Sequence, residues 1–151
     1  VSLDFTMIDE DLQKKIVNEI QKELVTIFGL RTLSPNDSNY KGTYIGDYNK
    51  DMAYHNGTVW PWLMGPFIKA FVKIKNQRKY AFENFLKPML DIFGESWDGS
   101  IYEIFDGNPI YEPRGCITQA WSVAEILRSW VEDIENITQK YENILLHKIG
   151  I

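Results

Sequence analysis

The segment Gly99–Gly107 holds a carboxylate, Glu103, between two large apolar side chains, and glycines close the segment at both ends. Loops that join rigid elements are where proteins concentrate catalytic groups. Cleavage of a glycosidic bond uses two carboxyl groups, one that protonates the leaving oxygen and one that activates water or attacks directly. We therefore interpret Glu103 as half of the acid/base pair of a glycoside hydrolase. The plain alternative is a solvated surface carboxylate.

A second segment, 30–58, is rich in Gly, Asn, Asp, Ser and Tyr and has no clear periodicity. A loop of that length in a compact domain is usually functional or disordered, and its tyrosines argue against disorder. If the flanking helices pair antiparallel, this segment and residues 95–114 meet at one end of the fold. Together they would form a polar depression rimmed by aromatic rings, which suits a sugar. The side chains concerned are Arg31, Tyr40, Tyr44, Asp47, Tyr48, Asp51, Tyr54, His55, Asn56, Glu103, Asp106 and Arg114.

The elements that position these segments are predicted to be helices. Apolar residues recur at helical spacing from Asp9 to a stop at Gly29, over 60–75, over 78–93, over 116–133 and, in a shorter stretch, over 136–147. Pro66 lies inside the second stretch and should kink it. No strand pair is evident. The order of helices and loops predicts an all-α fold of helical hairpins, forming a toroid or part of one.

Composition excludes several functional classes. The 151 residues carry 16 basic and 21 acidic side chains, a net charge of −5 with no basic stripe, so a nucleic-acid partner is not expected. No apolar run approaches the roughly 20 residues that span a bilayer, so we expect no membrane association. A single cysteine, Cys116, excludes an internal disulfide and indicates a reducing, cytoplasmic location. Two histidines and the absence of HExxH, CxxC or phosphate-binding glycine motifs predict neither metal nor cofactor.

Five runs carry a resemblance to a known family. The C-terminal catalytic domain of glycogen debranching enzymes is similar over about residues 1–132, with these runs in the same order. They are FGLRTLSP (28–35), YKGTYIGD (40–47), AYHNGTVWPWLMGPF (53–67), GSIYEIFDG (99–107) and PRGCITQAWSVAE (113–125).

The resemblance implies amylo-α-1,6-glucosidase activity, which is removal of glucose from α-1,6 branch points of glycogen, limit dextrin or other branched α-glucans. It also implies an inverting mechanism on an (α/α)6 barrel, the six-hairpin toroid that glucoamylases share. Glucoamylases carry a comparable Gly-Ser-x-x-Glu loop before a Trp-Ser helix, and by that match Glu103 is the general base. Arg31 and Trp121 match substrate-binding positions of the glucoamylase pattern. The remaining substrate contacts carried over are Tyr44, Asp51, His55, Asn56 and Trp60.

The chain departs from the family pattern in one respect. The family's general acid, an aspartate, lies upstream of the matched segment, and four or five helices cannot close a ring of twelve. We therefore expect residues 1–151 to be a single domain, the C-terminal part of the catalytic domain and an incomplete barrel, inactive alone. Its partner would be the N-terminal part of the same enzyme or, through exposed helix faces, a second copy in a homo-oligomer.

Two other functions stay open at this point. One is a non-catalytic, helical glucan-binding or scaffolding fragment that keeps the sugar pocket without the chemistry. The other is a glucoamylase-like α-1,4-glucosidase, against which the HxGTVWPW block argues.

Overall fold

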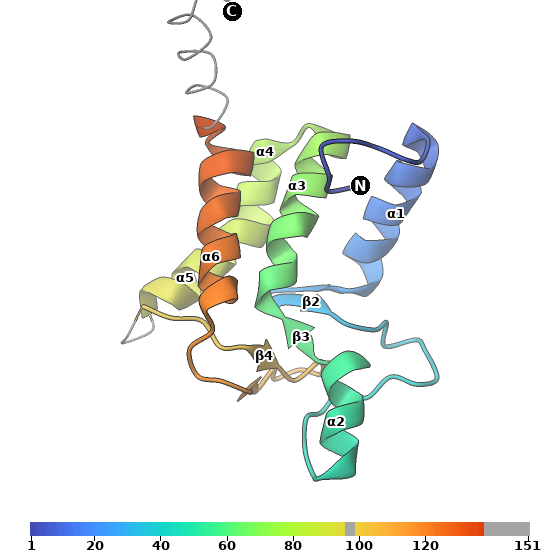
Figure 1. The fold of residues 1–151 in the computed structure, drawn as a ribbon, viewed down its shortest axis with the longest axis vertical. Coiled ribbons are helices and arrows are strands. Elements are labelled where there is room, and N and C mark those ends of the chain that lie inside the picture. The colour runs from blue at the N-terminus through green and yellow to red at the C-terminus, as the bar shows by residue number, and fades with distance from the viewer. Residues whose placement is uncertain (96–98, 138–151) are drawn as a thin grey trace, which may run out of the picture.

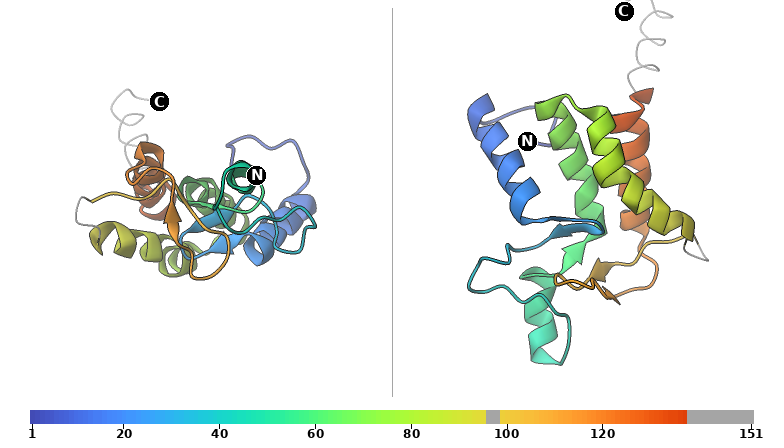
Figure 2. Two further views of the ribbon diagram at one scale, coloured as in Figure 1. Left: turned by 90° about the horizontal axis from the view of Figure 1, so that it is seen from below. Right: turned by 180° about the vertical axis from the view of Figure 1, so that it is seen from behind.

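The computed structural model describes residues 1–95 and 99–137. A layer of helices lies on one side of a small antiparallel sheet, and α2 (Tyr48–His55) lies beyond the sheet on the opposite side (Figure 1). The view from behind shows the same three levels, with α2 again separated from the other helices by the strands (Figure 2).

The helices of this layer occur in the stretches of helical periodicity. They are α1 (Glu10–Glu23), α3 (Met64–Lys75), α4 (Arg78–Ala81), α5 (Lys87–Glu95) and α6 (Ala120–Arg128). Helix α1 ends at Glu23, before the predicted stop at Gly29, and α6 begins at Ala120 rather than near 116. Two π-helical segments extend them, Phe82–Leu86 between α4 and α5, and Ser129–Ile134 after α6. Asp9 caps α1, because its carboxylate accepts a 2.8 Å hydrogen bond from the Leu12 N–H.

Helix α3 lies at the centre of the helical layer, in contact with α1 on one side and α6 on the other. Met64, Ile68 and Phe71 on α3 are at most 2% exposed and form the middle of the hydrophobic core. Pro66 is predicted to kink or loosen its turn; in the structure a 3₁₀ turn at Pro61–Leu63 precedes α3, which begins at Met64. Pro66 therefore lies in the first turn of the α-helix, where a missing N–H costs little.

The sheet has five short strands in the order β1-β2-β3-β4-β5, all antiparallel to their neighbours. Their bounds are β1 (Val25–Thr26), β2 (Gly29–Arg31), β3 (Val59–Trp60), β4 (Ile104–Phe105) and β5 (Pro113–Arg114). Val59 pairs with Phe105, which joins the end of segment 30–58 to the segment that contains Glu103.

The prediction of an all-α fold, with only helical hairpins from an (α/α)6 barrel or six-hairpin toroid, is wrong, since this sheet connects the helices. Strands of two or three residues are too short to show the alternation by which a strand is recognised in a sequence. Their pairing still satisfies backbone N–H and C=O groups that the buried ends of the loops would otherwise leave unpaired.

The segment 30–58, for which the sequence predicts a loop, contains α2. The predicted helix at 136–147 lies almost entirely outside the described residues, which end at 137. Within the described part of the chain, none of the helices combines the length and the apolar content needed to cross a bilayer.

The backbone conformation and close packing of Gly29 predict that a side chain at this position lowers the stability of the fold. Its φ is +140°, and a Cβ at this position would collide with the Trp60 carbonyl oxygen and lie 2.7 Å from the Pro61 Cα. We expect Gly29→Ala to destabilise the protein by about 2 kcal/mol or more, because both backbone strain and a displaced β2–β3 pair oppose it. The matched control is Gly94→Ala, which meets no atom within 4 Å in α5. Thermal unfolding should show a lower midpoint for Gly29→Ala alone, and equal midpoints would contradict the prediction.

Candidate functional site

A cavity of about 390 Å³ opens where the two predicted loop segments meet. Its lining residues are Tyr44, Asp51, Tyr54, His55 and Glu103. Tyr44 precedes α2, the next three side chains project from α2, and Glu103 comes directly before β4. The prediction that segments 30–58 and 95–114 form one depression is therefore confirmed.

The backbone of the Glu103 segment is fixed by the segment that follows β5. The Glu103 N–H donates to the Cys116 carbonyl at 2.9 Å, and the Gln119 N–H donates to the Ile101 carbonyl at 2.9 Å. This pairing places the Cys116 N–H against the Glu103 side chain, where it donates to Oε2 at 3.0 Å. The orientation of the carboxylate is thus fixed by the backbone of Glu103 and by the backbone N–H of Cys116.

The second oxygen of the Glu103 carboxylate has a side-chain donor. The Tyr54 hydroxyl donates to Oε1 at 2.7 Å. Burial raises the pKa of Glu103, but the hydrogen bonds from Tyr54, Cys116 and Gln119 oppose it, and the net pKa lies below its usual value. Glu103 is consequently an ionised carboxylate at neutral pH, able to accept a proton rather than to supply one.

Gly115 makes room for this carboxylate. Its φ is +68°, and a Cβ added there would collide with Oε2 of Glu103 and lie 3.1 Å from the Glu103 Cβ. The glycine is therefore required twice, by a left-handed backbone and by the closeness of the acid.

Asp106 holds the wall of the cavity from the sheet side. Its buried carboxylate accepts the Tyr44 N–H at 2.8 Å and pairs with Arg114, with Nε at 3.2 Å and Nη2 at 3.0 Å. The Gly107 N–H adds a 2.8 Å hydrogen bond to the Gly42 carbonyl. These contacts fix the segment before α2 to the strand that follows Glu103.

Four of the predicted substrate contacts, Arg31, Asn56, Trp60 and Trp121, lie outside the cavity lining. Arg31, on β2, donates to the Gly107 carbonyl at 2.9 Å and to the Tyr111 hydroxyl at 3.1 Å. Asn56 follows α2, and its carbonyl accepts the Lys41 N–H at 2.7 Å. In this structure Arg31 and Asn56 bind the segments around the cavity.

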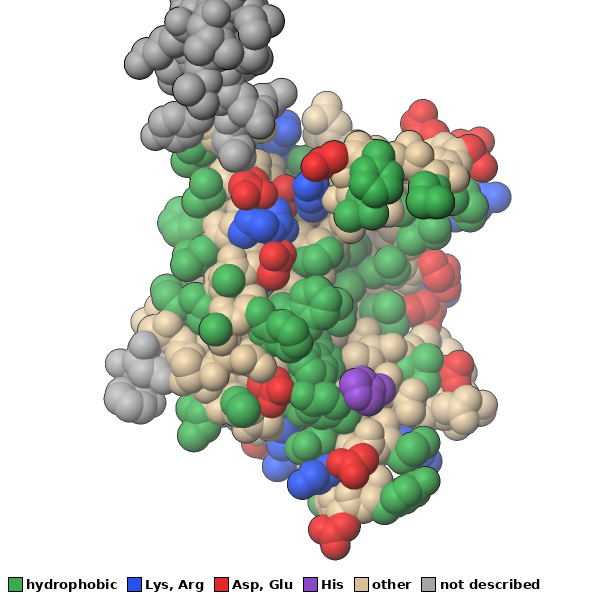
Figure 3. All heavy atoms as spheres, viewed as in Figure 1, with side chains coloured by type: hydrophobic (Ala, Val, Ile, Leu, Met, Phe, Trp, Pro, Cys, Tyr) green, Lys and Arg blue, Asp and Glu red, His purple; other side chains and the backbone are tan. Residues whose placement is uncertain are grey.

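Aromatic rings connect the cavity to the surface. Tyr54 meets Trp60 edge-on at 4.8 Å, Trp60 contacts Trp121 at 6.1 Å, and Trp121 contacts Trp62 at 5.5 Å. Trp60 is buried, whereas Trp121 on α6 is 49% exposed. Hydrophobic side chains gather at the middle of the face seen in Figure 3, over the junction of helices and strands. Two of the predicted residues, Trp60 and Trp121, thus form an aromatic path beside the acid.

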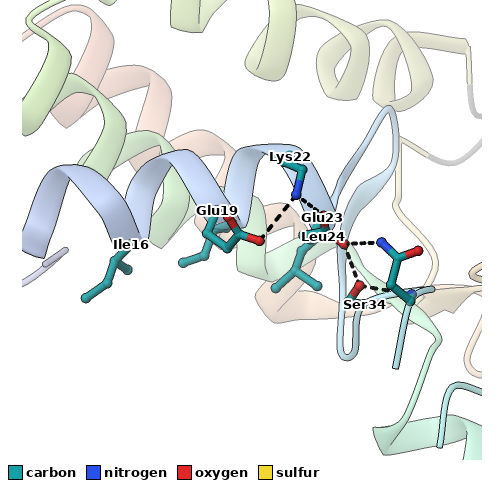
Figure 4. A pocket seen from close by; sticks show the side chains of 8 residues that line it. Ile16, Glu19, Lys22, Glu23, Leu24 and Ser34 are labelled. Carbon is teal, nitrogen blue, oxygen red and sulfur yellow. Dashed lines mark hydrogen bonds and ion pairs between the residues drawn. The ribbon is translucent and has the colours of Figure 1, made fainter. Parts of the chain in front are cut away.

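A larger hollow, about 610 Å³, runs along α1 and the segment 34–36 (Figure 4). Its polar groups already bind one another, because the Glu23 carboxylate accepts from Lys22 at 2.6 Å, Ser34 at 2.6 Å and Asn36 at 2.7 Å. These hydrogen bonds lower the pKa of Glu23 to about 2. These contacts hold the loop against the end of α1. The polar groups in them bind one another and are not directed at a ligand, so the smaller cavity is the better candidate for a binding site.

Three features of this site are not predicted by the sequence pattern. Tyr54 was one of four tyrosines in a segment without predicted structure, and its position on α2 is what directs it at Glu103. The Cys116 N–H is a backbone group that no residue pattern reveals. Asp106 and Arg114 were noted as loop residues, but their pairing depends on the β4–β5 hairpin. In the described part of the chain, no group of three or more potential metal ligands occurs.

Comparisons with known proteins give a family match and curated relatives, among them a yeast protein. The family model described as amylo-alpha-1,6-glucosidase matches residues 1–128. A glycogen debranching enzyme from Saccharomyces cerevisiae (strain ATCC 204508 / S288c) is 28% identical over 134 residues, which covers 66% of this chain. The match spans about 8% of the length of that relative.

The glycines near Glu103 allow a matched test of the site's geometry. Gly46 has φ +82° and no atom within 4 Å of an added Cβ, whereas Gly115 has a similar φ and the Glu103 carboxylate in the way. We expect Gly115→Ala to lower the free energy of unfolding by about 1–2 kcal/mol more than Gly46→Ala, because displaced Oε2 loses its bond to the Cys116 N–H. Urea unfolding of both variants measures the difference. Equal losses would show that the carboxylate moves aside freely.

Proposed function

The chain belongs to the amylo-alpha-1,6-glucosidase family, and from that premise we propose that Glu103 is the general base of an inverting glycoside hydrolase. The substrate in this proposal is a branched α-glucan, glycogen or a limit dextrin, from which glucose is removed at an α-1,6 branch point. The observation that carries the proposal is the ionised Glu103 carboxylate, held by two neutral donors on the wall of an aromatic cavity.

The proposed reaction moves two protons, one from the attacking water to Glu103 and one from a general acid to the leaving oxygen. Water attacks the anomeric carbon while Glu103 accepts its proton, and the bond from that carbon to the leaving O6 breaks. A carboxylic acid on the opposite face protonates O6, so that free glucose of inverted configuration and the shortened glucan leave. Inverting enzymes place these carboxyl groups about 6.5–9.5 Å apart, which leaves room for the water.

The other residues of the site receive roles from their positions. Tyr44, Asp51 and His55 line the cavity and are proposed to bind sugar hydroxyls. Trp60 and Trp121 offer flat apolar faces for a glucose ring, and the half-exposed Trp121 is accessible from solvent. Arg31 and Asn56 are proposed to support these contacts by holding the surrounding segments.

The general acid is proposed to come from another part of a longer polypeptide. This chain corresponds to about 8% of the yeast relative's length, so most of such an enzyme lies outside it. Asp51 shares the cavity with Glu103, but it is exposed and is proposed here as a substrate contact.

The exposed free thiol of Cys116 suits a reducing compartment, and we propose a cytoplasmic location.

Expression of residues 1–151 alone tests the need for the second carboxyl group. We expect no release of glucose from a limit dextrin above background, because Glu103 can activate water but the proposed general acid lies in another part of the polypeptide. The full-length protein, assayed in parallel at equal molarity, is the positive control. Turnover by residues 1–151 at a rate like that of the full-length protein would overturn this part of the proposal.

Glu103→Gln in the full-length protein separates a base from a glucan-binding residue. The amide keeps the size of the side chain but cannot accept the proton, so kcat for glucose release should fall about 10²-fold or more with little change in KM. Glu83→Gln, on the exposed surface of the helical layer, is the matched control and should keep wild-type kcat. Undiminished kcat in Glu103→Gln would favour the non-catalytic glucan-binding function. Isomaltose compared with maltose as substrate distinguishes the α-1,6 from the α-1,4 specificity.

A further inference from the structure

Tyr54 joins the proposed base to the helix that forms the opposite wall of the cavity. Its hydroxyl reaches from α2 to Oε1 of Glu103 across 49 residues of sequence, at 2.7 Å. Burial and the charge of Glu103 both raise the pKa of Tyr54, so the hydroxyl keeps its proton and remains a donor. The bond therefore has a fixed direction, from the phenol to the carboxylate.

Tyr54 is itself held in place through both its backbone and its ring. Its backbone carbonyl accepts the Thr58 hydroxyl at 2.9 Å and the Trp60 Nε1–H at 3.1 Å. Its ring packs edge-on against Trp60 at 4.8 Å and against His55 at 5.0 Å. Thr58 is fully buried and Trp60 nearly so, which makes this support rigid.

Neutral donors surround the Glu103 carboxylate. Tyr54 faces it from α2, and Cys116 and Gln119 face it from the segment after β5. The other cavity residues, Tyr44, Asp51 and His55, include no lysine or arginine. Within the described lining, the negative charge of Glu103 is therefore stabilised by oriented hydrogen bonds and not by a lysine or arginine. Each of these bonds helps to fix the orientation of the carboxylate.

We propose that Tyr54 is a positioning residue for Glu103, which holds Oε1 so that the carboxylate is directed at the attacking water. With Oε2 fixed by the Cys116 N–H, the Tyr54 bond removes the remaining rotation about the terminal bond of the side chain. The inference depends on the proposed role of Glu103 as base. Tyr54 acts through Glu103 and takes no proton itself.

The test is Tyr54→Phe in the full-length protein, which keeps the ring contacts and removes only the hydroxyl. With isomaltose as substrate, kcat should fall about tenfold to a hundredfold while KM stays within about twofold, since a misdirected base slows the chemical step. The loss of a donor to the charged form raises the pKa of Glu103. The acidic limb of kcat/KM against pH should therefore move up by about one unit.

Two matched variants control for the loss of a hydroxyl. Tyr44→Phe removes another hydroxyl from the same cavity and should leave the acidic limb where it is in wild type. Tyr80→Phe removes one from the helical layer and should leave both kcat and the pH profile unchanged. Thermal unfolding of each variant shows that the fold is kept.

The outcomes separate this inference from the proposal beneath it. If Glu103→Gln abolishes glucose release but Tyr54→Phe retains wild-type kcat and an unmoved acidic limb, the positioning role is overturned and the base remains. A wild-type kcat in Glu103→Gln overturns both. Reduced kcat with an upward-shifted acidic limb in Tyr54→Phe, together with an inactive Glu103→Gln, supports the inference.

Discussion

The pairing of β3 with β4 is the contact on which the candidate site depends. It consists of one register pair, Val59 with Phe105, both of them almost completely buried. The pair brings the end of α2 beside the segment that carries Glu103, and the hydrogen bonds from Tyr44 to Asp106 and from Gly107 to Gly42 reinforce the same junction. Two strands of two residues each thus bring the cavity walls together. The helices of the main layer do not, since they pack on the far side of the sheet from α2 (Figure 1).

Two acids of one short segment illustrate how environment assigns a role. Asp106 is buried, and its charge is balanced by Arg114 and by the Tyr44 N–H, so it serves to fix the backbone. Glu103, three residues earlier, is partly exposed and is bound only by neutral donors among the contacts described above. The ion pair suits Asp106 to a structural role, and the lowered pKa of Glu103 keeps that carboxylate ionised, as its proposed role as base requires.

The sequence predicted the helices well because each repeats its apolar spacing over several turns, as in Val17 on α1 and the core residues of α3. It did not predict the strands, since two residues cannot display a period, or α2, whose sequence YNKDMAYH has no sustained apolar stripe. The meeting of Glu103 with Tyr44, Asp51 and His55 was predicted from the loop order. The bond from Tyr54 was not, because choosing one tyrosine among four requires knowing the helix on which it lies.

The large sequence separation between Tyr54 and Glu103 has a consequence for how the molecule folds. Helices such as α1 and α3 depend on contacts between near neighbours and can form within microseconds, before distant segments meet. The cavity needs residues 44–59 and 103–119 together, and closing a loop of that length costs chain entropy that only the finished sheet recovers. Single helices are therefore expected to form before the site does. During synthesis, Tyr54 must wait until the chain has been extended past Cys116 before its carboxylate partner is in place.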